Sequence, residues 1–171
     1  GGKTTNLEHI HRHSRPDSRG KLVSLMTESE RTLFFDLLPM ELGTFRGYTV
    51  RLHLCTVPGQ IAQNKTRRLV LRHTDGIVFV VDSQEAMLAA NLESMHNLAE
   101  NLRLQGSDPS SLPLAVQYNK RDLPNAMPID ELRQALGVPE GVREHEACAV
   151  KGWGVSATLK SITTECLKLL G

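Results

Sequence analysis

The sequence lacks most of the features that would tie it to a membrane, a polyanion or an oxidising compartment. Twenty basic and nineteen acidic residues leave a formal net charge of only +1, so no overall charge attracts nucleic acid. The three cysteines are odd in number and form no C-x-x-C pair, which favours reduced thiols over disulfides or zinc. No apolar run reaches the roughly eighteen residues of a membrane span. We expect a cytoplasmic protein with no nucleic-acid partner and no integral membrane segment.

The composition is that of an ordinary globular domain, with 171 residues of which 40% are hydrophobic and 23% charged. Short apolar or β-branched runs alternate with longer segments of helical period, which is typical of an α/β fold with a mainly parallel sheet. The run GIVFVV indicates a strand buried on both faces. We expect strands over 21–26, 48–55, 76–81, 114–118 and 144–148, and helices over 4–13, 61–71, 84–104, 129–136 and 155–170.

The chain opens with GGKTTN, which matches only the end of a phosphate-binding loop. Gly2, Lys3 and Thr4 fit the last fixed positions of G-x-x-x-x-G-K-[ST], but the earlier glycine and the strand before it are absent. In this architecture that strand is central, and burying some five large side chains contributes about 10 kcal/mol, which equals the whole net stability of a typical domain. We therefore expect a single domain over 1–171 that is truncated at its N-terminus.

The motif NKRD, over 119–122, follows the predicted strand LAVQY, and strand ends are where open α/β sheets bind ligands. A carboxylate at Asp122 can accept hydrogen bonds from N1–H and the 2-amino group of guanine, whereas adenine offers neither donor there. Lys120 can lay its stem along the base, and Asn119 can tie this loop to the phosphate loop. The alternative is a polar strand-to-helix turn without a ligand.

A third motif, TVPGQ, follows the predicted strand YTVRLHLC. Small GTPases usually carry D-x-x-G-Q here, with the glycine amide sensing the γ-phosphate and the glutamine orienting the attacking water. Gly59 and Gln60 fit this pattern. Thr56 does not, because its hydroxyl can help to order a magnesium-bound water but supplies no negative charge. Further along, Ala149 lies where the guanine loop S-A-K is expected, and its backbone N–H could reach the guanine O6.

Together these stretches resemble the bacterial MglA-type Ras-like GTPases, a family that controls cell polarity and gliding motility. The resemblance covers essentially the whole chain and is most specific in TVPGQ and TLFFD. It implies the P-loop NTPase fold of a small GTPase, a doubly wound mixed sheet of six strands with an antiparallel edge and the first strand missing here. It also implies GTP, GDP and Mg²⁺ as cofactors, a Roadblock/LC7 homodimer as activator and effector, further downstream effectors, and recruitment to cell poles.

The resemblance also implies roles for single residues. Lys3 would pair with the β- and γ-phosphates, and Thr4 would ligate magnesium. Thr32 would complete the magnesium shell only when GTP is bound. Arg31 resembles the family's intrinsic arginine finger, and Gln60 its water-positioning glutamine. The other expected nucleotide contacts are Gly2, Thr5, Gly59, Asn119, Lys120, Asp122 and Ala149.

Two other carboxylates need an interpretation. Asp82 in VVDS is similar to a Walker-B carboxylate, but the alignment puts it at the end of the next strand, so we expect a structural role. Asp36, with the Phe34–Phe35 pair, is expected to couple the switch to a partner, and core packing is the alternative for the phenylalanines.

Three functions are open from the sequence. The first is a GTP-dependent switch that hydrolyses GTP slowly until a partner moves Arg31 toward the phosphates. The second is a degenerate interaction module with little or no hydrolysis, which Thr56 favours and the retained Lys3, Gln60 and Asp122 oppose. The third is an ATP-using P-loop kinase, which the guanine-selecting NKRD opposes.

Overall fold

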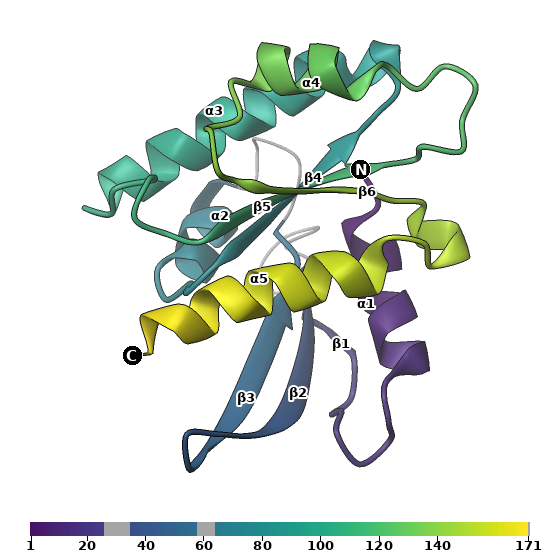
Figure 1. Cartoon of the computed structure of the whole chain (residues 1–171). Helices are drawn as coiled ribbons and strands as arrows, with labels where there is room; N and C mark the ends of the chain where they lie inside the picture. The colour runs from purple at the N-terminus through teal and green to yellow at the C-terminus, as the bar shows by residue number, and fades with distance from the viewer. Residues whose placement is uncertain (26–34, 58–63, 171) are drawn as a thin grey trace.

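The strands form two sheets, of which the one with β4, β5 and β6 lies at the centre of the molecule, while the hairpin of β2 and β3 extends to its lower edge (Figure 1). The computed structural model describes residues 1–25, 35–57 and 64–170. Within them, one three-stranded sheet is antiparallel and has the order β1-β2-β3, and the other is parallel and has the order β4-β5-β6. The strands are β1 (Val23–Leu25), β2 (Phe35–Phe45), β3 (Tyr48–Cys55), β4 (Ile77–Asp82), β5 (Leu114–Asn119) and β6 (Arg143–Glu146). The expected mixed α/β architecture is confirmed.

The parallel sheet carries the main core. Val81 and Val116 are fully buried in it, and Tyr118 is 1% exposed. A strand that is buried on both faces has a continuous apolar sequence, and GIVFVV is such a run. The register pairs Asp82 at the end of β4 with Asn119 at the end of β5. Both side chains therefore lie at the carboxyl edge of the sheet, where ligands of this architecture bind.

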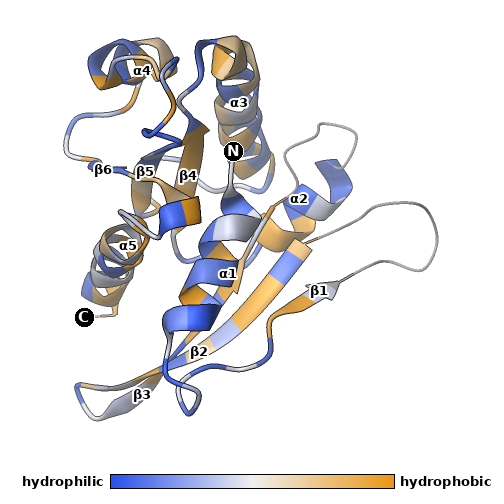
Figure 2. Ribbon diagram, turned by 90° about the vertical axis from the view of Figure 1, so that its right-hand side faces the viewer, coloured by the Kyte–Doolittle hydropathy of each residue, from blue (hydrophilic) through white to orange (hydrophobic). Residues whose placement is uncertain are grey.

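Helices cover both sides of the strands (Figure 1). Helix α1 (Lys3–His13) contacts β2 and α5 (Val155–Leu169), and α5 packs on β4, β5 and β6. On the other side, α3 (Leu88–Leu104) packs on β4 and contacts α2 (Asn64–Leu71) and α4 (Ile129–Leu136). Two short 3₁₀ turns, η2 (Glu85–Met87) and η3 (Ala149–Lys151), precede α3 and α5. Figure 2 shows hydrophobic residues concentrated on β2 and β4, which these helices cover.

Strand β2 was not predicted, because Pro39 and the bulge between Glu41 and Gly43 interrupt its pattern. The structure shows how a proline fits. The Pro39 carbonyl accepts a hydrogen bond from the Gly20 N–H at 2.8 Å. In an antiparallel strand the N–H and C=O of one residue point to the same side, so the missing N–H of Pro39 faces away from β3. The other expected elements are confirmed with shifts at their ends, and the helix expected over 84–104 begins only at Leu88, after the turn η2. The end of the strand expected over 21–26 and the start of the helix expected over 61–71 lie outside the described residues.

The strand expected before Gly1 is not part of this sequence. Among the described residues the two sheets share no ladder. Gly1 lies beside β4, since a Cβ placed on it would be 3.2 Å from the Val80 carbonyl oxygen. The upstream strand, and the truncated single domain over 1–171, stay predictions.

Gly154, at the start of α5, offers a first test of this packing. Its φ is 77°, and a Cβ there would overlap the Glu146 carbonyl oxygen. Gly141 has a similar φ of 83° with no neighbour within 4 Å. We expect Gly141→Ala to lower the free energy of unfolding by about 1–2 kcal/mol, the cost of the left-handed backbone alone. Overlap adds about 1–3 kcal/mol for Gly154→Ala. Urea unfolding of the intact gene product measures both, and equal losses would contradict the close contact.

Candidate functional site

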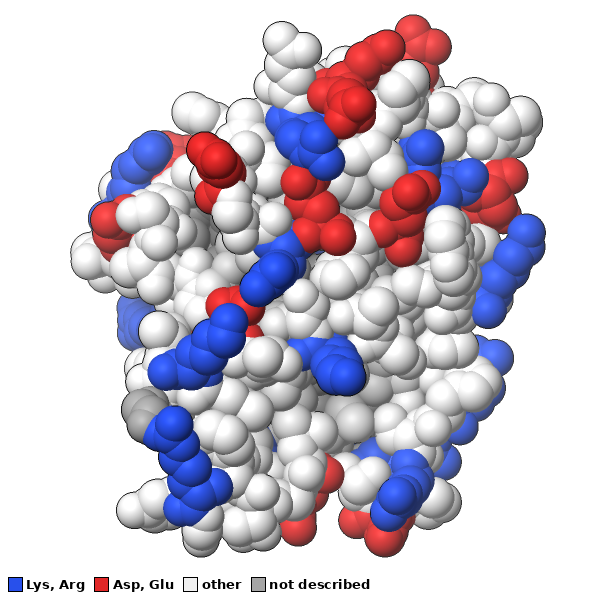
Figure 3. Space-filling view, viewed as in Figure 1, with Lys and Arg blue, Asp and Glu red and all other residues white. Residues whose placement is uncertain are grey.

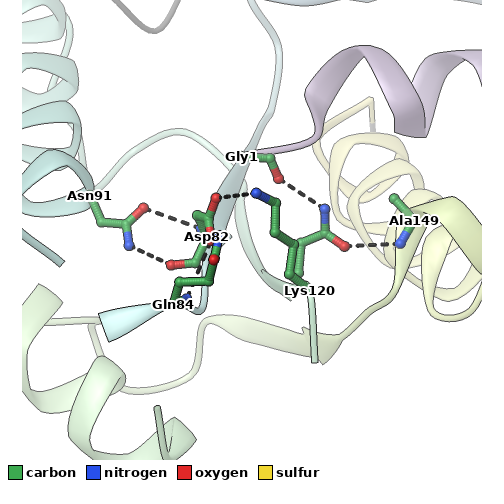
Figure 4. Close-up of polar contacts among 7 residues, drawn as sticks. Gly1, Asp82, Gln84, Asn91, Lys120 and Ala149 are labelled. Carbon is green, nitrogen blue, oxygen red and sulfur yellow. Dashed lines mark hydrogen bonds and ion pairs between the residues drawn. The ribbon is translucent and has the colours of Figure 1, made fainter. Parts of the chain in front are cut away.

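Three segments that are far apart in the sequence meet at the carboxyl edge of the parallel sheet, and the side chain of Asn119 joins them. Its Nδ2 donates a hydrogen bond to the Gly1 carbonyl at 2.9 Å, and its Oδ1 accepts one from the Ala149 N–H at 2.9 Å (Figure 4). Asn119 is only 2% exposed. Because a buried amide must satisfy both of its ends, this one group sets the spacing between the start of α1 and η3.

The start of α1 is shaped by contact with the same asparagine. Gly2 has a φ of 96°, and a Cβ there would overlap the Asn119 Nδ2, so only glycine fits. The first turn contains Lys3, Thr4 and Thr5, whose backbone N–H groups precede the first helical hydrogen bond, from Asn6 N–H to Gly2. Free amides and the positive end of a helix dipole favour an anion such as phosphate.

Lys3 is partly buried at this helix start. Burial lowers the pKa of Lys3, and the nearby Arg67 of α2 lowers it further. The same dry surroundings strengthen the attraction between the Lys3 ammonium group and any phosphate that reaches it. Lys3 is therefore placed to meet an anionic ligand at the start of α1.

Lys120 is held by an ion pair that the sequence alone did not reveal. Its Nζ lies 2.6 Å from Asp82 Oδ2, and its φ of 62° is unusual for a residue with a side chain. Gln84 Nε2 also donates to Asp82, at 3.0 Å, and Asn91 hydrogen-bonds both backbone groups of Asp82 (Figure 4). Burial acts to raise the pKa of Asp82, but the hydrogen bonds from Lys120 and Gln84 lower it overall. Asp82 therefore holds Lys120 in place, and the structural role expected for it stays a prediction.

Asp122 lies beside η3, where its carboxylate contacts Cys148 and Lys151. The hydrogen bond from the Cys148 side chain lowers the pKa of Asp122, and Lys151, with its Nζ 3.6 Å away, lowers it further. A carboxylate kept ionised is an acceptor only, which suits the two donors on guanine. Ala149, expected to donate to guanine O6, donates to Asn119 here. A guanine at this position would have to share or replace that hydrogen bond.

On the other side of the start of α1, Thr4 meets the antiparallel sheet. Thr4 Oγ1 donates to Asp36 Oδ2 at 2.9 Å, and Thr56 Oγ1 donates to the same oxygen at 3.1 Å. Hydroxyl and carboxylate oxygens are the ligands that Mg²⁺ prefers, so the donors around Thr4 fit this ion. The contact of Asp36 with both threonines was not anticipated from the sequence, because the three residues lie on separate elements.

Four of the expected site residues lie outside the described residues. They are Arg31, Thr32, Gly59 and Gln60. Their catalytic, magnesium and γ-phosphate roles stay predictions.

A cavity of about 460 Å³ lies elsewhere, between α1, the β2–β3 hairpin and α5. Ile10, Phe45 and Leu159 are among its lining residues, and none of the expected nucleotide contacts lines it. Figure 3 shows lysine, arginine, aspartate and glutamate interspersed over the face of the molecule that carries α5. Among the described residues, no helix is long and apolar enough to cross a membrane.

Comparison with known proteins decides the family. Residues 37–168, from within β2 to the last turn of α5, match the ADP-ribosylation factor family, Arf. The chain belongs to this family of small GTPases. As an Arf-family protein it is a GTP hydrolase and a GTP-binding switch, and the P-loop NTPase fold is confirmed.

Individual relatives agree with this assignment. The chain is 50% identical over 161 residues to "Mutual gliding-motility protein MglA" of Myxococcus xanthus. This match covers 94% of this chain and 82% of that protein. It is 30% identical to human "ADP-ribosylation factor-like protein 4C" and 33% identical to "ADP-ribosylation factor-like protein 2" of Drosophila melanogaster. These two matches cover 74% of this chain and 65% and 61% of the relatives.

The bridge made by Asn119 can be tested by removing its side-chain amide. Asn119→Ala leaves the Gly1 carbonyl and the Ala149 N–H without this partner, at about 1–3 kcal/mol for each unsatisfied buried group. We expect weaker binding of a fluorescent GDP analogue and a lower thermal midpoint in the intact gene product. Asn125→Ala, which changes an exposed asparagine on the following turn, is the matched control. Equal affinity in both variants would show that the bridge does not position the nucleotide.

Proposed function

We propose that this Arf-family chain is a magnesium-dependent GTP switch that hydrolyses GTP slowly until a Roadblock/LC7-type homodimer engages it, and that it regulates cell polarity or motility. The observation that carries the proposal is that the side chain of Asn119 hydrogen-bonds both the Gly1 carbonyl and the Ala149 N–H, which brings the start of α1 next to the end of β5. These residues come from the phosphate-loop end and the NKRD motif.

The base is recognised by Asp122 in this proposal. Its ionised carboxylate accepts hydrogen bonds from N1–H and the 2-amino group of guanine, while the stem of Lys120 covers one face of the base. The ion pair with Asp82 supports this arrangement, because it limits the rotamers that Lys120 can adopt. Adenine is rejected because its N1 would present a lone pair to the carboxylate.

The phosphates bind at the start of α1. Gly2, Lys3, Thr4 and Thr5 supply backbone N–H groups, and the ammonium group of Lys3 pairs with the β- and γ-phosphates. Magnesium, when bound, neutralises charge on the phosphate oxygens. Thr4 holds this ion through its hydroxyl, and Thr32 joins only in the GTP state. A contact made in one nucleotide state alone is what allows a ligand to shift a conformational equilibrium.

Hydrolysis depends on residues of this chain that the activator brings into place. Gln60 orients the attacking water, the Gly59 amide senses the γ-phosphate, and Arg31 stabilises the charge that develops in the transition state. An arginine finger is worth ~10³–10⁵ in rate for GTPases in general. A resting state that keeps Arg31 away from the phosphates therefore hydrolyses slowly.

The proposed cellular process is based on sequence similarity to a relative. The 50% identity to a mutual gliding-motility protein supports a role in motility or polarity. We propose a cytoplasmic protein that is recruited to cell poles and that passes its GTP state to downstream effectors.

Base selection gives the first test of the proposed function. A fluorescent GDP analogue is titrated into the intact gene product with magnesium and competed with GTP, GDP and ATP. We expect displacement by guanine nucleotides only, and loss of that preference in Asp122→Asn. Asp130→Asn, which changes an exposed carboxylate on α4, serves as the control and keeps the preference. Absence of guanine-nucleotide binding by the folded protein would refute the switch and favour an interaction module.

The arginine finger gives the second test. With a Roadblock/LC7 homodimer from the same genome, we expect Arg31→Ala to lower the stimulated rate of GTP hydrolysis by roughly 10³-fold or more. The affinity for the GDP analogue stays unchanged, since Arg31 acts on the transition state. Arg12→Ala, at the exposed end of α1, is the control and keeps the stimulation. Full stimulation of Arg31→Ala would show that the catalytic arginine lies elsewhere.

A further inference from the structure

Helix α1 and the turn η3 meet at a second place besides the bridge made by Asn119. A Cβ placed on Gly152, the residue after η3, would overlap the ring atoms Cε1, Nδ1 and Nε2 of His9. The φ of Gly152 is 75°, which also favours glycine. The imidazole of His9 therefore lies directly on the Gly152 backbone, and Figure 1 shows α1 beside the turn that precedes α5.

These two elements carry different halves of the proposed nucleotide site. Helix α1 begins with the residues proposed to bind phosphate, of which Lys3 is one. The turn η3 begins with Ala149, the residue expected near guanine O6, and ends with Lys151, whose Nζ is 3.6 Å from Asp122 Oδ2. A side chain that fixes the distance between α1 and η3 therefore fixes the distance between the phosphate contacts and the base contacts.

The ring of His9 contacts a second histidine as well as Gly152. The rings of His9 and His13 are stacked, with centroids 4.0 Å apart and an angle of 24° between their planes. His13 lies one turn further along α1, at the spacing that brings side chains of a helix together. Its Nδ1 is 2.9 Å from the His9 carbonyl oxygen, which orients the second ring. This packing suits neutral rings, because two imidazolium ions at such a separation repel each other.

Cationic groups from three elements lie around His9. Burial lowers the pKa of His9, and His13 and Arg12 on the same helix lower it further. From α5, Lys160 lines the cavity that His9 also lines, and the residues of the β2–β3 hairpin that line this cavity are uncharged. The turn η3 contributes Lys151. His9 is therefore neutral at neutral pH while α1 and η3 are in contact.

Protonation of His9 opposes the contact between α1 and η3. A histidine in water has a pKa of about 6.5. His9 regains this pKa when η3 moves away from α1, so the separated form binds more protons than the closed form. The contact is thus complete above pH ~6.5 and is weakened as the pH falls below that value. The ring also borders the cavity of about 460 Å³, which gives it space to leave Gly152.

We propose that His9 is a positioning residue for nucleotide binding, which holds η3 against α1 in its neutral form and releases η3 in its protonated form. The base contacts and the phosphate contacts then lie at the right distance only while His9 is neutral. This inference rests on the guanine-nucleotide binding of the proposed function. It adds the proton as an effector of this chain, so that nucleotide affinity falls at acidic pH.

The first measurement is the pH dependence of nucleotide affinity. The dissociation constant of a fluorescent GDP analogue is measured with saturating Mg²⁺ between about pH 5.5 and 8, the range in which histidine titrates. Three forms of the intact gene product are compared: wild type, His9→Phe and His11→Phe. His9→Phe keeps a flat ring on Gly152 but cannot take up a proton. His11→Phe is the matched control, since residues two apart on a helix do not face each other.

The comparison between variants isolates His9, because titration of the nucleotide phosphates affects all three forms alike. We expect the wild type to lose about fivefold more affinity than His9→Phe toward acidic pH, the lower end of typical couplings between two sites. His11→Phe follows the wild type. A purely structural role for His9 gives a different pattern, in which His9→Phe lowers the affinity by the same factor at every pH, and this result would overturn the proposal.

A second measurement decides the question if His9→Phe does not fold. The Cε1 proton of His9 is followed by NMR as the pH is varied, in the GDP-bound wild type and in Gly152→Ala. We expect the pKa of His9 to lie below about 6.5 in the wild type and to return to that value in Gly152→Ala, because the added methyl group displaces the ring. An ordinary or raised pKa of His9 in the GDP-bound wild type overturns the proposal by itself.

The outcomes also separate this inference from the proposed function. If the folded wild type binds no guanine nucleotide at neutral pH, the switch fails and this inference fails with it. If the wild type binds the GDP analogue with the same pH dependence as His9→Phe, only this inference fails.

Discussion

The geometry of the site depends on one buried amide. Asn119 donates to Gly1 and accepts from Ala149, and these two contacts link segments that lie 118 and 30 residues away in the sequence. The parallel register of β4 and β5 brings Asn119 level with Asp82, which in turn holds Lys120. An asparagine placed one residue earlier on β5 would direct its amide to the opposite face of the sheet, since side chains alternate along a strand. The core of the parallel sheet, with Val81 and Val116 fully buried, keeps that register in place.

Much of the parallel half of the molecule could be predicted from the sequence because its information is local. GIVFVV and LAVQY are continuous apolar runs, and NKRD directly follows the second of them, so the strand and its ligand-binding end are read together. The partners of those residues could not be read in the same way. The ion pair of Lys120 with Asp82 joins two strands, and Asn91 supports it from α3. Nothing in the residues near Lys120 specifies that contact.

The antiparallel half was harder to predict for a different reason. Pro39 and the bulge between Glu41 and Gly43 hide β2, although its pairing with β3 is extensive. Sequence patterns for strands exclude proline because it has no N–H to donate to a neighbouring strand. Pro39 is tolerated because the side of β2 that lacks this N–H faces away from β3. With β2 unrecognised, Asp36 had no assigned neighbour, and its contacts with Thr4 and Thr56 stayed hidden until the strands were aligned. Arg31, Thr32, Gly59 and Gln60, which are expected to act on the γ-phosphate, lie outside the described residues.

The contact between Asp36 and Thr56 bears on how GTPase-like chains are sorted into active enzymes and pseudoenzymes. Such sorting usually scores each position of a motif by itself, and a threonine in place of a metal-site aspartate then counts as a loss. A hydrogen-bonded ladder brings the opposite position on the neighbouring strand within contact distance, as the hydrogen bonds between Asp36 and Thr56 show. A residue changed in such a motif is therefore better judged together with the residue opposite it on the neighbouring strand than by its identity alone.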